Sequence, residues 1–292
     1  MNNNTHGGIP NSWKMEDRKR KEVEHSDQRR SIVRAYEYYT DANPNGLESE
    51  YVVGENEYDR HFSNMKFYSV ARASFAYRDA CLYNGIEGLR VLDYCCGNGE
   101  IGVQMALKGA QLVYGIDLSP VAIDNARELA AHEGVADKCI FEVMDAEDTR
   151  FPDASFDIIH EYGALHHLDL KSAYSELSRI LKPDGRLVCT EAMRHNPIIH
   201  LYRRLTPHLR TQWEFEHILG VPEILMGKTH FSSVNMKFFH LASIGAVPFR
   251  KRSWFPKLLG ALETVDRFVL QLPYIQRWAW VSVVVFSGPR KS

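Results

Sequence analysis

The chain has 292 residues, 45% of them hydrophobic, which is enough to bury a full core in one large domain or two small ones. Its formal net charge is -2 at pH 7 and its pI is about 6.7, so no overall basic field favours binding to nucleic acid. The first residues lack the apolar segment of a signal peptide, and the longest apolar run, 278–286, is far shorter than the ~20 residues of a membrane helix. Five cysteines without framework spacing favour reduced thiols and a cytoplasmic location.

The N-terminal part of the chain divides into two segments. Residues 1–45 are polar and charged, and we expect a flexible arm with a short helix over 31–43. The basic run 18–21 is soon balanced by acids, so a solvated arm is favoured over a nucleic-acid contact. Residues 46–88 are rich in aromatic side chains and arginine, and we expect them to form a helical lid.

Regular alternation of strands and helices begins at residue 89. Ser119 and Pro120 mark the cap and first position of a helix that runs to about residue 132. Apolar strands are predicted at 89–94, 111–117, 139–145, 156–162 and 186–192. Near-continuous apolar strands that alternate with helices predict an α/β fold, with a parallel sheet covered by helices on both faces.

The pattern changes after residue 192. A helix rich in arginine and histidine is expected over 193–219, inside a helical substrate cover spanning 193–235. A helix and a strand are expected within 232–253, and a last strand at 279–286. The segment 256–272 is amphipathic; its apolar stripe favours core packing, with association to a membrane surface as the alternative.

The stretch VLDYCCGNGE (91–100) closes the first predicted strand on a glycine turn. Counting from Gly97 to Gly102 gives G-x-G-x-x-G, the fingerprint of dinucleotide binding. However, Asp93 ends the strand and Glu100 starts the helix, and carboxylates at these two places would repel a pyrophosphate. The charges therefore disfavour a nicotinamide-dependent dehydrogenase.

Three successive predicted strands end in a carboxylate: Asp93, Asp117 and Asp145. Ligands of open α/β sheets bind at this carboxyl edge. Asp117 can accept both hydroxyls of a ribose, and Asp145 with its neighbouring backbone can accept from an adenine amino group. A nucleoside with a cationic tail and no phosphate fits this edge, which points to S-adenosylmethionine.

Four segments, in order and at matching spacing, resemble the class I S-adenosylmethionine-dependent methyltransferases of the small-molecule type, which includes the ubiquinone and menaquinone enzymes. They are VLDYCCGNGE, YGIDLSPVAIDNARE, VMDAEDTRFPDASFDIIHEYGALHHL and ELSRILKPDGRLV, within residues 89–192. The resemblance implies a Rossmann-like, mostly parallel seven-stranded sheet in a core of residues 89–292, with a helical insertion after the fifth strand. It also implies methyl transfer to a small molecule, with S-adenosylhomocysteine as product; a binding protein without methyl transfer is the alternative.

The resemblance further implies the residues that hold the cofactor. It places Asp93, Gly97 and Gly99 near the methionine moiety, Asp117 at the ribose, and Asp145 with its neighbour at the adenine. Cys95 departs from the pattern, because the family often has its first glycine there. Helices ahead of the first strand close over the cofactor in this family, although core packing is favoured for the tyrosine among them. The full set of expected cofactor residues is Tyr68, Arg72, Asp93, Cys95, Gly97, Gly99, Asp117, Leu118, Asp145, Ala146 and Glu161.

Methyl transfer from a sulfonium is an in-line displacement, so a base is needed only when the acceptor must lose a proton. His166, one turn after the fourth strand, is the candidate base, with a capping or packing histidine as the favoured alternative. Glu161 is a second catalytic candidate that would orient an amine, and a capping acid is its alternative. The candidate substrate contacts are Tyr162, His167, His195 and Arg203. The histidine spacing does not match a metal site. The acceptor and the oligomeric state stay open.

Overall fold

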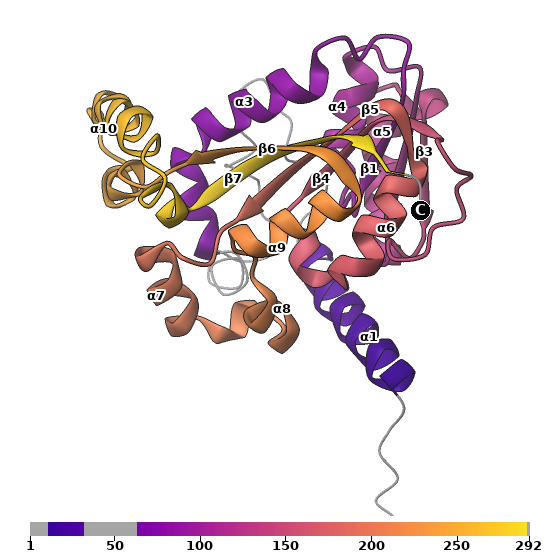
Figure 1. The fold of residues 1–292 in the computed structure, drawn as a ribbon, viewed down its shortest axis with the longest axis horizontal. Helices are drawn as coiled ribbons and strands as arrows, with labels where there is room; N and C mark the ends of the chain where they lie inside the picture. Colours follow the sequence, from indigo (N-terminus) through magenta and orange to yellow (C-terminus); the bar gives the residue numbers. More distant parts are fainter. Residues whose placement is uncertain (1–10, 32–62, 291–292) are drawn as a thin grey trace, which may run out of the picture.

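A mixed sheet forms the centre of the molecule (Figure 1). The computed structural model describes residues 11–31 and 63–290. The strand order is β3-β2-β1-β4-β5-β7-β6; β7 runs antiparallel to both neighbours, and the other neighbouring pairs are parallel. The seven strands are β1 (Arg90–Tyr94), β2 (Leu112–Asp117), β3 (Cys139–Val143), β4 (Phe156–Tyr162), β5 (Leu181–Ala192), β6 (Phe231–Phe239) and β7 (Val281–Pro289). This arrangement confirms the predicted Rossmann-like α/β fold.

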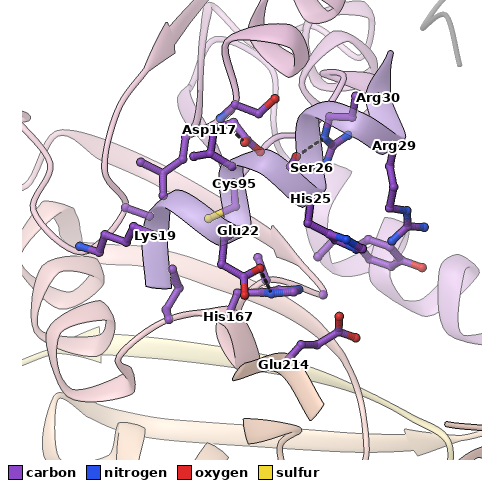
Figure 2. A pocket seen from close by; sticks show the side chains of 18 of the residues that line it. Lys19, Glu22, His25, Ser26, Arg29, Arg30, Cys95, Asp117, His167 and Glu214 are labelled. Carbon is purple, nitrogen blue, oxygen red and sulfur yellow. Dashed lines mark hydrogen bonds and ion pairs between the residues drawn. The ribbon is translucent and has the colours of Figure 1, made fainter. Parts of the chain in front are cut away.

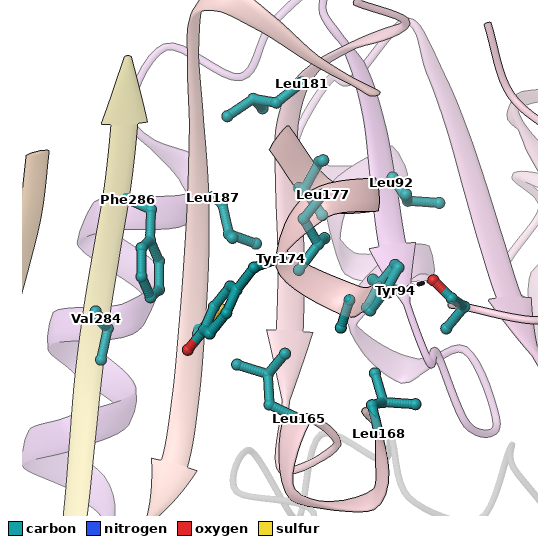
Figure 3. Packing of buried hydrophobic residues seen from close by; sticks show 14 of the residues in the cluster. Leu92, Tyr94, Leu165, Leu168, Tyr174, Leu177, Leu181, Leu187, Val284 and Phe286 are labelled. Atoms are coloured by element: carbon teal, nitrogen blue, oxygen red, sulfur yellow. Dashed lines mark hydrogen bonds between the residues drawn. The ribbon is translucent and has the colours of Figure 1, made fainter. Parts of the chain in front are cut away.

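Adjacent residues of a strand point to opposite faces of the sheet, so each face has its own apolar core, and helices cover both. Val91 packs with residues of α4 (Glu100–Leu107) and α5 (Pro120–His132), whereas Leu92 belongs to the core beneath α6 (Leu170–Ile180). Figure 3 shows this second core, in which Tyr174 of α6 lies among side chains of the strands. A third cluster holds residues of α3 (Arg72–Tyr83) and α10 (Phe255–Val269) against β7.

Local sequence signals account for where the main helices begin. Ser119 Oγ accepts from the backbone N–H of Ala122 at 3.0 Å, and Asp169 caps α6 by accepting from the N–H of Ser172 at 2.9 Å. Short polar side chains at these positions satisfy backbone donors that a helix start leaves unpaired. The remaining elements are α1 (Asn11–Arg30), α7 (Pro197–Leu205), α8 (Gln212–His217) and α9 (Val221–Leu225), with 3-10 helices at Ser63–Val70, Ala136–Lys138, Leu165–His167, Pro207–Leu209, Met226–Thr229, Ser243–Phe249 and Gln276–Trp278.

The N-terminal segment corrects one prediction. Residues 1–45 were expected to form a flexible arm, but α1 is a 20-residue helix that packs on the core, and Arg18 on it is buried. Its charged side chains find oppositely charged partners on the core, which composition alone does not reveal. The helix expected over 31–43 lies outside the described residues except for its first residue.

The region after β5 corrects one more prediction. The single helix expected over 193–219 is interrupted, because Pro207 cannot continue α7 and its ring restricts the preceding residue. Within 232–253 the expected helix and strand are present as β6 and the 3-10 helix Ser243–Phe249. The predicted helix at 256–272 and the last strand at 279–286 are present as α10 and β7. In the described parts of the chain, all helices are too short or too polar to cross a lipid bilayer.

Candidate active site

The carboxyl ends of β1, β2 and β4 meet at one edge of the sheet, where Tyr94 pairs in register with both Ile116 and Glu161. A cavity of about 290 Å³ opens at this edge, at the lower end of the roughly 300–1,000 Å³ typical of small-molecule sites. Core residues and α1 line it together. The predicted site residues in its lining are Cys95, Asp117, Leu118, Ala146, Tyr162 and His167.

The glycine turn after β1 is held in shape by Asp117. The backbone N–H of Gly97 donates to Asp117 Oδ2 at 3.0 Å, and the N–H of Ser119 donates to Oδ1 at 2.9 Å. Cys95 has φ 58°, Gly97 has φ 57° and Gly99 has φ 80°, so the chain enters the left-handed region three times within this turn. Cys95 keeps this conformation despite its Cβ, which costs strain that glycine would avoid.

Asp93 stabilises the same turn without lining the cavity. Its Oδ2 accepts from the N–H of Gly102 at 2.8 Å, and its Oδ1 lies 2.8 Å from Nδ1 of His160. The side chain is buried, so its charge acts on the turn from within the protein. Asp93 therefore holds the start of α4 in place.

Helix α1 roofs the cavity (Figure 2). Lys19 Nζ lies 2.5 Å from Asp145 Oδ2, at the position expected to meet the adenine, and 2.8 Å from Glu147 Oε2. Arg18 pairs with the same Glu147 at 2.5 Å. Further along, Arg30 donates to Asn98 Oδ1 at 3.3 Å beside the glycine turn. Described residues 63–88 are not part of this lining, so α1 takes the covering position expected of the helices that precede β1.

Two adjacent histidines occupy different positions at the cavity. His167 lines it, and its Nδ1 lies 2.8 Å from Glu22 Oε2 of α1. His166 is buried behind, with Nδ1 2.8 Å from Glu191 Oε2 and Nε2 3.9 Å from Glu214 Oε1. Burial lowers the pKa of His166 and raises that of Glu191 to about 7. The lowered pKa favours the uncharged form of the His166 ring.

Glu161 and Tyr162 end β4. Glu161 is fully buried, and its Oε1 accepts from the backbone N–H groups of Ala164 and Leu165. Burial, and then the neighbouring Glu191, raises the pKa of Glu161 well above its usual value, which favours the neutral carboxyl form. Tyr162 reaches the cavity lining, and burial holds its hydroxyl in the protonated form.

Four predicted site residues lie elsewhere. Tyr68 packs with its ring 5.4 Å from that of Trp280, in the core. Arg72 is half exposed and pairs with Glu263 of α10 at 2.5 Å, so it does not reach the cavity. His195 and Arg203 line a second cavity near α7 and α8.

Glu191 and the α1 side chains were not identified from the sequence. Glu191 sits near the end of β5, so the rule applied to the first three strands, a carboxylate at the strand tip, would have found it on the fifth. The contacts of α1 gave no such signal, because Lys19 and Asp145 are 126 residues apart in the chain. Within the described residues, histidine, cysteine and acidic side chains do not gather in a group suited to a metal ion.

Comparison with known proteins agrees with this geometry. The family model for a methyltransferase domain matches residues 86–232. The 27-O-demethylrifamycin SV methyltransferase of Amycolatopsis mediterranei (strain S699) is 39% identical over 101 residues, covering 34% of this chain and 37% of that protein. The tocopherol O-methyltransferase of Arabidopsis thaliana is 36% identical over 100 residues, covering 34% and 29%. The chain thus spans well under two thirds of these relatives.

Two solved structures share the fold. The geranyl diphosphate C-methyltransferase from Streptomyces coelicolor A3(2) has a TM-score of 0.56 at 17% identity and covers 94% of this chain and 98% of its own. The [4+2]-cyclase SpnF has a TM-score of 0.51 at 18% identity and covers 75% and 82%. At these identities the likeness concerns the fold alone.

Proposed function

Because the chain belongs to the class I S-adenosylmethionine-dependent methyltransferases, we propose that it transfers the methyl group of S-adenosylmethionine to a small-molecule acceptor. The observation that carries the proposal is the cavity at the carboxyl edge, where Asp117 and Glu100 stand beside the glycine turn. A pyrophosphate at this turn would meet two carboxylates, whereas a nucleoside with an ammonium group would be attracted to them.

The proposed cofactor contacts follow from which groups retain hydrogen-bonding capacity. Asp117 oxygens each accept one backbone N–H and have lone pairs left for ribose hydroxyls. Ala146 lines the cavity next to Asp145, which supports the adenine position. The glycine turn at Cys95, Gly97 and Gly99, together with Leu118, would border the methionine moiety, with Asp93 and Glu161 as positioning residues.

The chemistry is a displacement in which an acceptor lone pair attacks the methyl carbon and the C–S bond electrons return to sulfur. When the acceptor carries a proton, we assign its removal to His167, since this ring lines the cavity. His166 packs against it, with ring centroids 4.3 Å apart, and Glu191 fixes His166 in place. In this proposal His166, the candidate base from the sequence, is a positioning residue, in keeping with the packing role favoured for it there.

The second cavity supports an anionic group on the acceptor. Arg203 is buried, donates to the carbonyl of Met193 at 3.1 Å, and among the described residues has no carboxylate within 4.0 Å. A buried cation without an acidic partner is costly unless a ligand neutralises it. His195 and Arg204 line the same cavity. We therefore propose that a carboxylate or phosphate of the acceptor pairs with Arg203.

Calorimetric titration with S-adenosylhomocysteine and with NAD tests the cofactor, and incubation with methyl-labelled S-adenosylmethionine and candidate acceptors tests the transfer. We expect S-adenosylhomocysteine binding that Asp117→Ala weakens by about 1.5–3 kcal/mol, the usual loss for hydrogen bonds to a charged group. Binding of NAD alone would refute the proposal. Binding of S-adenosylhomocysteine without label transfer to any acceptor would favour the alternative of a non-methylating protein of this fold.

A further inference from the structure

The surface around α10 combines exposed apolar side chains with a concentration of cations. Seven large apolar residues between positions 249 and 278 are exposed, and several of them are more than half exposed: Phe249, Trp254, Val265, Phe268, Leu272, Tyr274 and Trp278. Phe268 is 71% exposed and Tyr274 is 77% exposed. A monomeric protein in water rarely leaves so many large apolar side chains together on its surface.

Helix α10 is apolar on two faces. Leu259 is buried and Leu262 packs against the same cluster, which fastens the helix to the protein. Val265 and Phe268 lie three residues apart on another side and remain exposed, and Leu272, just after the end of the helix, is exposed as well. The inward stripe accounts for folding, whereas the outward stripe is unused within the described structure. A helix with apolar residues on its outer face can bind a second apolar environment through that face.

The same stretch of the chain is rich in exposed cations. Six basic side chains within 249–278 are exposed: Arg250, Lys251, Arg252, Lys257, Arg267 and Arg277. The only acids in the same stretch are Glu263 and Asp266. Glu263 is paired with Arg72, and Asp266 is buried and accepts from the N–H groups of Ala242 and Ser243. The exposed charged side chains of this stretch are therefore all basic, although the whole chain is slightly acidic.

Exposed apolar side chains together with exposed basic ones limit which partners can bind this surface. A second copy of the chain bound through the same face would bring six cations against six cations, which opposes a symmetric dimer. An anionic lipid surface satisfies both features, because acyl chains accept Trp, Phe and Leu while the headgroups attract Lys and Arg. Trp and Tyr are also the residues that favour the interface between lipid and water.

We propose that the surface formed by residues 249–278 binds the face of an anionic membrane, with α10 lying in the plane of the interface. Figure 1 places α10 and α1 at opposite sides of the molecule, so a membrane at α10 would leave the cofactor cavity open to solvent. This inference does not depend on the proposed methyl transfer. Binding through this surface would hold the enzyme beside a lipid bilayer.

Sedimentation with vesicles tests the proposal. The full chain is mixed with vesicles of phosphatidylcholine alone, or with about 30% phosphatidylserine added, at low and high salt. We expect binding to the anionic vesicles, weakened by salt. Phe268→Ser and the pair Lys251→Glu with Arg252→Glu should each reduce binding about tenfold. Leu205→Ser is the matched control, since Leu205 is 70% exposed on α7, away from this surface.

Two outcomes would overturn the proposal. The first is the absence of binding to anionic vesicles, or equal binding by the wild type, Phe268→Ser and the charge-reversed protein. The second is concentration-dependent dimerisation in analytical ultracentrifugation that Phe268→Ser abolishes while vesicles do not bind, which would make a second copy the occupant. Circular dichroism of each variant shows whether the fold is intact, and S-adenosylhomocysteine binding measured in parallel reports on the cofactor cavity independently.

Discussion

Gly99, at the start of α4, offers a sharp test of how the cofactor turn is built. Its φ of 80° costs a residue with a Cβ about 1–2 kcal/mol. A Cβ there would also lie 2.6 Å from Cβ of Ala126 on α5, a clash that forces the two elements apart. Overpacking of this kind costs about 1–3 kcal/mol. Gly99→Ala should therefore lower the free energy of unfolding by about 2–5 kcal/mol.

The matched control is Gly134→Ala. Gly134 has φ 71°, but a Cβ there would meet nothing within 4 Å, so only the backbone cost of about 1–2 kcal/mol applies. Urea denaturation followed by circular dichroism measures both variants. Equal destabilisation would refute the claim that α5 closes on the turn. Gly99→Ala should also weaken S-adenosylhomocysteine binding, whereas Gly134→Ala should leave it unchanged.

Four further predictions concern the roof and the floor of the cavity. Lys19→Met removes two ion pairs, so hydrogen exchange in α1 should accelerate while the sheet stays protected. Burial lowers the pKa of His25 on α1, so protonation of this ring opposes the docking of α1 on the core. The backbone amides of α1 should therefore exchange hydrogen faster at about pH 5 than at about pH 7.5, after correction for intrinsic exchange rates. Equal corrected rates would contradict this. Because burial favours the neutral form of Glu161 and a Gln amide oxygen can accept the same two backbone N–H groups, Glu161→Gln should change stability little, whereas Glu161→Ala should cost about 1–3 kcal/mol, measured by urea denaturation. With a protonated acceptor, His167→Gln should lower turnover roughly 10²–10⁴-fold and His166→Gln less; the reverse order would return the base to His166.

The features that could be predicted from the sequence depend on residues close together in the chain. Strand periodicity gave β1 to β5, and Ser119 marked the start of α5 because its hydroxyl caps a backbone donor only three residues away. Strand order at a parallel sheet edge then brought Asp117 into the cavity lining. These are local or topological rules, and a single sequence expresses them.

The remaining features depend on contacts between distant segments. Arg72 has the charge for a carboxylate ligand, but Glu263, 191 residues later, holds it. The run that contains Arg18 and Lys19 looks like a solvated tail until Asp145 and Glu147 provide its partners. A sequence pattern assigns such charged side chains to solvent, because it does not contain the information about which acidic residues the fold brings close to them.

The roof and the proposed membrane surface give the two ends of the molecule different tasks. At one end, α1 is held over the cavity by pairs such as Lys19 with Asp145 and Glu22 with His167, which are partly exposed and so individually weak. A cofactor that offers its own hydrogen bonds to Asp145 and Asp117 can displace such contacts at small cost. At the other end, α10 is fixed to the core through Leu259, which keeps its outward apolar face on a rigid support. Entry of a cofactor would need local opening at α1, whereas the proposed adsorption to a lipid surface needs a preformed apolar face, and the two ends meet these different needs.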